Sequence, residues 1–182
     1  MNIKENFSLK ERIGTKKSTE RPLNEDVGHI HGFVTVIKNI GRPDEEILCE
    51  DKENLLTTDG LDEFHQTMYI DTTATQTGFN FIALTADVGA PALGDTALTG
   101  EITVNGLQRI LASTRTHIDD TNVSTIGHTF TATGQVLNVQ KSGLFDLIGP
   151  PVAGVLSHEN IFTPASVENN DTLTVTWTLT MG

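Results

Sequence analysis

The feature that most constrains the fold is the alternation of side chains in residues 172–181, which read TLTVTWTLTM. Every odd position is apolar and every even position is threonine. Successive side chains of a β-strand point to opposite faces, so this period of two places all the apolar side chains, including Trp177, on one face. The segment therefore predicts a strand with a buried face and a threonine face that meets solvent or a partner. Threonine suits such a face because it is β-branched, uncharged and able to hydrogen-bond across strands.

From residue 78 onward, the spacing of turn-forming residues is typical of a β-sandwich. Short runs of β-forming residues are separated by Gly, Pro, Asn and Asp, which is typical of a sandwich or a jelly roll. Upstream, the alternating segment 32–37, the turn at 41–44 and the segment 46–50 predict an opening hairpin. The downstream strands are expected at 79–85, 107–117, 126–133, 135–144, 152–162 and 172–181.

One segment has helical spacing instead. Apolar or bulky side chains recur three and four residues apart after Gly60, at Leu61, Phe64, His65 and Met68. Thr58 or Asp59 can cap the helix, and acidic residues follow in its first turn. We therefore expect an all-β domain with one short helix near 58–68.

Charge divides the chain into an arm and a body. The chain has 182 residues, enough for one well-buried core. Residues 1–27 have a net charge of +1 and no useful apolar period, whereas the remaining 155 residues have a net charge of −13. We expect an extended N-terminal arm at 1–27, which lies along a neighbouring subunit or rests on its own domain, and a single sandwich domain at 28–182. The candidate partner-binding residues are the arm cations Lys4, Lys10, Arg12, Lys16, Lys17 and Arg21.

The overall composition excludes several classes of function. A net charge of −12 argues against nucleic-acid binding, because neutralising phosphates needs clustered Lys and Arg. No stretch approaches the roughly 18 apolar residues of a membrane span, and the first residues do not resemble a signal peptide, so we expect synthesis in the cytosol and no membrane partner. The single cysteine, Cys49, predicts a fold held by its core or by assembly rather than by a disulfide.

Potential metal ligands are present but poorly arranged. His29 and His31 form an H-x-H pair, yet two ligands without a third make a poor zinc site. Four aspartates in expected loops do not follow the calcium-loop pattern, and we interpret them as solvated loop carboxylates: Asp87, Asp95, Asp119 and Asp120. No metal or other cofactor is expected.

The sequence also lacks a recognisable catalytic motif. Ser113, His117 and Asp119 invite a hydrolase interpretation, but no G-x-S-x-G motif is present, and residues four apart on one strand lie ~13 Å apart. Cys49 precedes two acidic residues that would raise the pKa of its thiol, which disfavours a nucleophile. The scattered glycines match neither a phosphate-binding loop nor a dinucleotide fingerprint. We therefore expect a protein that is not an enzyme.

A family resemblance emerges from the order of several short segments. These are NLLTTDG at 54–60, FNFIALT at 79–85, GDTALTGE at 94–101, Arg109 before a Thr-rich strand, KSGLFD at 141–146, VLSHE at 155–159 and DTLTVTW at 171–177. Together they cover residues 50–182 and resemble small β-rich structural proteins of tailed bacteriophages and archaeal tailed viruses. The resemblance implies a virion component without catalytic residues.

The resemblance leads to a hypothesis with two alternatives. The first hypothesis is a capsid decoration or vertex (cement) protein that forms homo-oligomers and uses its arm to bind the major capsid protein, other virion proteins or neighbouring copies. It would be made in the host cytoplasm and end in the virion. The alternatives are a tail or baseplate accessory protein, and a host-attachment or carbohydrate-binding module. With one Trp and one Tyr, the chain offers few aromatic rings to stack on sugars.

Two side-chain interactions are also expected within the domain. Glu101 and Arg109 lie on neighbouring segments and are expected either to form an exposed, weak ion pair or to be solvated separately. Phe145 follows Gly143-Leu144 at the end of a predicted strand and is expected in the core rather than at an interface.

Overall fold

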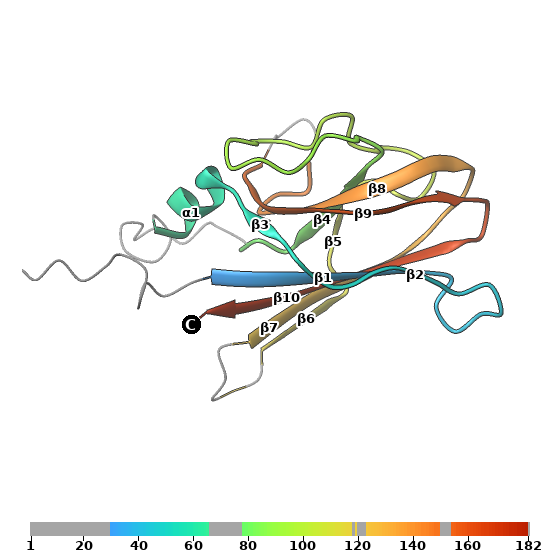
Figure 1. Cartoon of the computed structure of the whole chain (residues 1–182), viewed down its shortest axis with the longest axis horizontal. Coiled ribbons are helices and arrows are strands. Elements are labelled where there is room, and N and C mark those ends of the chain that lie inside the picture. Colours follow the sequence, from blue (N-terminus) through green and yellow to red (C-terminus); the bar gives the residue numbers. More distant parts are fainter. Residues whose placement is uncertain (1–29, 66–77, 118, 120–122, 150–153, 182) are drawn as a thin grey trace, which may run out of the picture.

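Two antiparallel five-stranded sheets pack face to face in the computed structural model, which describes residues 30–65, 78–117, 119, 123–149 and 154–181 (Figure 1). The first sheet, sheet A, has the strand order β2-β1-β10-β7-β6. Its strands are β1 (Ile30–Lys38), β2 (Glu46–Glu53), β6 (Thr114–His117), β7 (Val123–Thr131) and β10 (Thr172–Met181).

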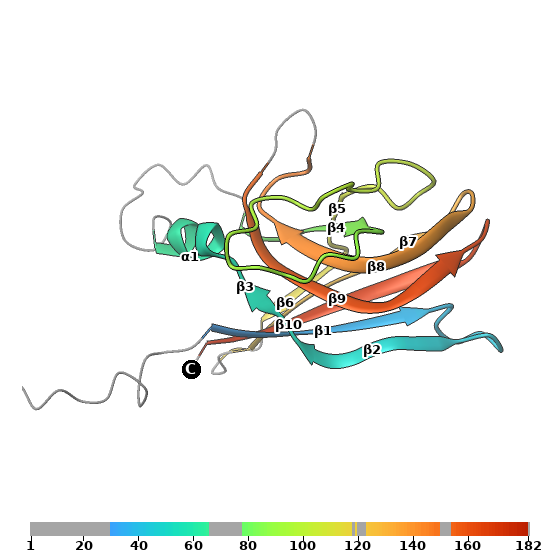
Figure 2. The ribbon, with the colours of Figure 1, turned by 45° about the horizontal axis from the view of Figure 1, so that its top comes forward.

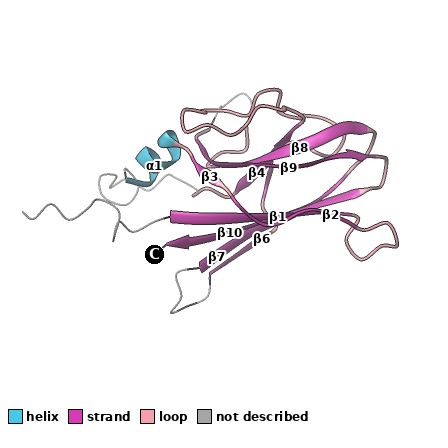
Figure 3. Cartoon of the chain, viewed as in Figure 1, coloured by secondary structure: helices cyan, strands magenta, loops and turns pink. Residues whose placement is uncertain are grey.

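The second sheet, sheet B, has the strand order β3-β9-β8-β4-β5. Its strands are β3 (Leu55–Leu56), β4 (Phe81–Thr85), β5 (Ile110–Leu111), β8 (Val136–Phe145) and β9 (Leu156–Val167). The helix α1 (Thr58–His65) is the one helix in the described part of the chain, and it lies at one end of the sandwich beside β3 (Figures 2 and 3). The predicted all-β sandwich with a short helix is confirmed.

The C-terminal strand shows how the sequence builds the sheet. β10 spans the predicted residues 172–181 and lies between β1 and β7, paired along its length with both. Leu173, Val175 and Trp177 are fully buried, as their alternation predicts. They meet apolar side chains of the opposite sheet, such as Ile82 and Leu144, in one core between the two layers. Trp177 is the largest of the fully buried side chains.

The prediction of a single strand at residues 107–117 is wrong. The segment 107–117 does not form a single strand, because the chain crosses from one sheet to the other in its middle. β5 pairs with β4 in sheet B, and β6 then pairs with β7 in sheet A. At the crossing, the Ala112 amide donates to Asn80 O (2.9 Å) and the Ser113 hydroxyl donates to Gly127 O (3.4 Å). These two bonds connect the two layers at this edge of the sandwich.

The helix begins at Thr58, as predicted, but its capping residue lies one position earlier than predicted. The Thr57 hydroxyl accepts the Gly60 amide (3.1 Å), so Thr57 is the N-cap rather than Thr58 or Asp59. Gly60 lies directly against β9, since a Cβ at this position would be 2.5 Å from the Cα of Ser157. The predicted residues 66–68 of the helix lie outside the described residues.

The two sheets differ in what covers their outer faces. The long segment 86–109 lies over sheet B, and Leu98 packs there against Ala83, Phe145 and Leu156. No described element lies over the outer face of sheet A (Figures 1 and 2). Among the described residues, the outer face of sheet A is therefore the uncovered one.

Candidate functional site

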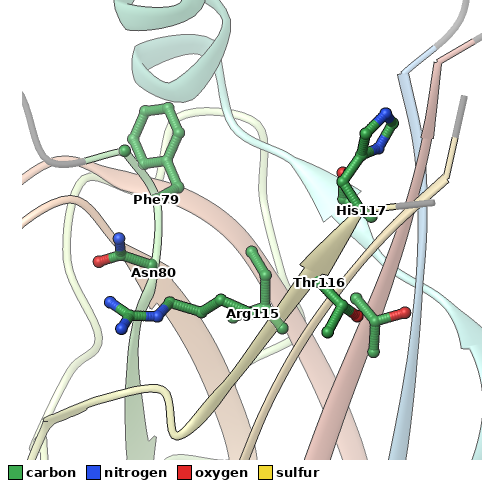
Figure 4. A pocket seen from close by; sticks show the side chains of 9 residues that line it. Phe79, Asn80, Arg115, Thr116 and His117 are labelled. Carbon is green, nitrogen blue, oxygen red and sulfur yellow. The ribbon is translucent and has the colours of Figure 1, made fainter. Parts of the chain in front are cut away.

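The described residues form a pocket of about 310 Å³ at the edge of the sandwich. It lies between the segment that leads into β4 and the paired strands β6 and β7 (Figure 4). The side chains that matter most for its chemistry are Phe79, Asn80, Arg115, His117, Ser124 and Ile126.

Strand register explains which side chains enter this pocket. Arg115 pairs with Ile126 and His117 pairs with Ser124, so these four residues share one face of sheet A. It is the inner face, because Ile126 is also the neighbour of the buried Trp177. The Arg115 side chain extends across the pocket toward Asn80 (Figure 4).

His117 is held at the rim by its own hairpin. Its Nδ1 lies 3.0 Å from Val123 O and 3.3 Å from Ser124 Oγ. The contact with a carbonyl oxygen places a proton on Nδ1, which leaves Nε2 to face away from the hairpin. Ser113 bonds to Gly127 instead, so the structure does not join Ser113 to His117 in the arrangement that a hydrolase would need.

The other residues with potential for chemistry have ordinary surroundings. In the described ranges, no group of three or more His, Cys, Asp or Glu side chains is placed to hold a metal ion. His29 lies outside these ranges, and the backbone of His31 pairs with Thr180 in sheet A. The pKa of the Cys49 thiol is raised as predicted, but the main cause is burial rather than its acidic neighbours.

The Glu101–Arg109 ion pair is present and is buried, contrary to the expected exposed geometry. Arg109 Nε lies 2.9 Å from Glu101 Oε1, and the second nitrogen, Nη2, contacts Oε2. The guanidinium carbon lies 3.5 Å from the centre of the Phe145 ring, and Nη1 donates to Leu147 O (3.2 Å). The side chains of Arg109 and Glu101 are 4% and 14% exposed. Phe145 is fully buried, which confirms its predicted place in the core.

A second buried ionic group lies under the same covering segment. Lys141 Nζ is 2.8 Å from Asp87 Oδ2 and 3.8 Å from Glu159 Oε2. Lys141 and Glu159 are 3% and 1% exposed. The Ala92 amide donates to both Glu159 Oε1 (3.0 Å) and Asp95 Oδ2 (2.9 Å). We call these four residues, Asp87, Asp95, Lys141 and Glu159, the Lys141 cluster.

Protonation within the Lys141 cluster follows from burial. The pKa of Glu159 is raised to about 7, mainly by burial and also by its hydrogen bond with Asp95. The same hydrogen bond, with Glu159 as the donor, is the main cause that lowers the pKa of Asp95. The hydrogen bond from Lys141 is the main cause that lowers the pKa of Asp87. One proton is therefore held between the Glu159 and Asp95 carboxyl groups.

Asp87 and Asp95 lie in loops and remain partly exposed, as predicted, but each carboxylate is also paired within the domain. The segment 86–109 folds back over β8 and β9, where buried Lys141 contacts Asp87 and buried Glu159 bonds to Asp95. Asp119 is exposed, as predicted, and Asp120 lies outside the described residues. Both ionic groups fasten the covering segment to sheet B.

The outer face of sheet A carries a broad array of threonines, which we call the threonine face. Cross-strand neighbours on this face include Thr129 and Thr174, whose hydroxyl oxygens lie 2.9 Å apart. On the described strands, the register places charged side chains of this face on the edge strand β2, where Asp51 contacts Thr35. Strand register assigns the following threonines to the face: Thr35, Thr114, Thr116, Thr125, Thr129, Thr131, Thr172, Thr174, Thr176, Thr178 and Thr180.

Comparisons with known proteins identify no relative of this chain. No family model, curated protein or solved structure matches this chain. The six arm cations predicted to bind partners lie outside the described residues. In the part of the chain that the structure describes, no helix is both long and apolar enough to cross a membrane.

Proposed function

We propose that this chain is a non-enzymatic structural protein of a tailed-virus particle, and that it decorates the capsid or its vertices. The observation that carries the proposal is the uncovered threonine face of sheet A. The resemblance of residues 50–182 to structural proteins of tailed viruses supports the same assignment. In this role the domain binds the major capsid protein or neighbouring copies, and it carries out no chemistry.

The threonine face has the physical properties of a protein-binding surface. The five strands of sheet A hold 40 residues, and at ~3.4 Å along each strand and ~4.8 Å between strands they give a face of about 650 Å². This area is close to the ~800 Å² that each partner buries in a standard stable interface. Threonine side chains are stiff at χ1, so a partner that covers them loses little side-chain entropy.

The charge distribution of this face fits the anatomy of an interface. Its central strands, β10 and β7, present uncharged threonines, whereas acidic side chains such as Asp51 and Glu53 lie on the edge strand β2. Stable interfaces have few charges at the centre and a polar rim. The acidic body repels other copies before assembly and keeps them soluble.

The arm has a complementary part in this proposal. Residues 1–27 directly precede the domain and bring six cations to a chain whose body has a net charge of −13. Opposite charges steer encounters and fix the register of a complex. The arm therefore attaches each copy to an acidic surface of the shell or of a neighbouring copy.

Introducing a lysine in the middle of the threonine face tests the proposal. Thr176 lies between Thr35 and Gly127 at the centre of sheet A. We expect Thr176→Lys to weaken binding to empty heads of the parent virus by at least about tenfold, because the interface buries an unpaired charge. Binding is measured by cosedimentation of the full-length chain with heads that lack this component.

The matched control is the same substitution on the other sheet. Thr163→Lys changes an exposed threonine of β9 and should bind heads as the wild type does. Equal binding by wild type and Thr176→Lys would show that the threonine face is not the contact surface.

A further inference from the structure

Arg115 differs from the other cations of the described body. Each of the others contacts a carboxylate or a backbone carbonyl: Lys38 with Asp171, Arg42 with Asn170 O, Lys52 with Ile161 O, Arg109 with Glu101, and Lys141 with Asp87. Within the described ranges, Arg115 is the cation for which the structure shows no such partner, although the body has a net charge of −13. A guanidinium left unpaired in so acidic a body is available to an external anion.

The position of Arg115 gives that anion a place to bind. Its side chain lines the pocket of about 310 Å³ and extends across it (Figure 4). Ligand pockets generally measure ~300–1,000 Å³, so this volume suits a compact organic molecule rather than a few waters. The pocket also offers apolar contact, because Phe79 and Ile126 line it and pack against the main core.

The chemistry of the pocket selects a carboxylate with a single charge. A guanidinium has a planar fork that matches the two oxygens of a carboxylate. A doubly charged phosphate would need more than one cation, and among the described lining residues Arg115 is the only Lys or Arg. The negative charge of the body also repels multiply charged anions more strongly than singly charged ones.

We propose that this pocket binds a monocarboxylate with a compact aromatic or apolar body. The carboxylate binds the Arg115 guanidinium, and the apolar body packs against Phe79 and Ile126. Arg115 and Ile126 lie on the inner face of sheet A, and the pocket borders the threonine face at Thr116 and Thr125, which also line it.

Benzoate is the probe that tests this proposal, with the full-length chain and amide chemical shifts as the readout. We expect saturable shifts at residues 79–80, 115–117 and 124–126, with a Kd of about 1 mM or lower. Arg115→Gln should weaken binding at least tenfold, and benzamide, the neutral analogue, should bind the wild type at least tenfold more weakly than benzoate does. Because the Arg115 side chain is exposed, the variant should fold as the wild type does.

Arg42→Gln is the matched control, since it removes the same charge from an exposed turn outside the pocket. It should bind benzoate as the wild type does. The absence of saturable shifts up to about 10 mM benzoate would overturn the proposal, as would equal binding by the wild type and Arg115→Gln.

The bound carboxylate could belong to another copy of the chain or to a free acid. Sedimentation velocity of the wild type and of Arg115→Gln, each without and with benzoate, distinguishes the two. Self-association that both Arg115→Gln and added benzoate abolish would support the pocket and assign its carboxylate to a second copy. Sedimentation that neither of them changes, together with benzoate binding, would support the pocket and assign it to a free acid.

Discussion

Replacing Arg109 with methionine should lower the free energy of unfolding by about 3–5 kcal/mol, because it leaves the Glu101 carboxylate buried without its cation. The loss is larger than for a surface ion pair, since the Arg109 and Glu101 side chains are 4% and 14% exposed. The substitution also removes the cation above the Phe145 ring and the bond to Leu147 O. Urea unfolding followed by Trp177 fluorescence measures the change.

Two further variants separate the ion pair from simple loss of packing. The double variant Glu101→Gln/Arg109→Met should lose less stability than Arg109→Met alone, because no unpaired charge remains buried. Arg42→Met alters an exposed arginine and should change stability by no more than about 0.5 kcal/mol. A loss near that value for Arg109→Met would contradict the buried geometry of the pair.

Replacing Glu159 with glutamine should remove the loss of stability that Glu159 causes as the pH rises from about 5 to 8, and should leave the opposite effect of His158, whose pKa burial lowers to about 4. In the folded chain burial raises the pKa of Glu159 from 4.5 to about 7. A raised pKa means that the folded state favours the protonated form. Its stabilising effect is therefore complete below pH 4.5 and is lost as the pH rises through 7.

The size and sign of this effect follow from the shift in pKa. Each unit corresponds to about 1.4 kcal/mol, so Glu159 should contribute a loss of about 2–3 kcal/mol between the two ends of that range. Glutamine is neutral at both ends and can still accept the Ala92 amide and donate to Asp95. Glu159→Gln should therefore match wild type near pH 5 and exceed its stability near pH 8.

Urea unfolding at a series of pH values checks this prediction. Glu46→Gln, at an exposed position of the edge strand β2, serves as the control and should keep the pH dependence of the wild type. Parallel profiles for wild type and Glu159→Gln would show that Glu159 holds no proton in the folded Lys141 cluster.

The strands with strict alternation were predictable from the sequence because a single local rule fixes them. In β10 every second side chain is apolar, and no tertiary contact is needed to assign its faces. The segment 107–117 lacks such a pattern. Its division into β5 and β6 depends on which sheet each half joins, and that choice is made by partners such as Asn80 and Gly127 far away in the sequence.

The buried ionic groups were harder to predict for the same reason. Asp87, Lys141 and Glu159 are more than fifteen residues apart, and charged side chains in turn-rich segments normally face solvent. The pairing of β8 with β9 brings Lys141 near Glu159, and the folding of segment 86–109 over sheet B adds Asp87. The sequence held one weak indication of the pocket. Arg115 and His117 are two residues apart, so on a strand their side chains share one face.

The central claim, that this is a capsid-associated structural protein, is tested most directly by measuring which part of the particle binds it. The full-length chain is cosedimented separately with purified empty heads and purified tails of the parent virus, together with a full-length variant whose six arm cations are glutamines. We predict saturable binding of the wild type to heads, and binding at least about tenfold weaker for the arm variant. Binding to tails alone, or to neither, would contradict the claim.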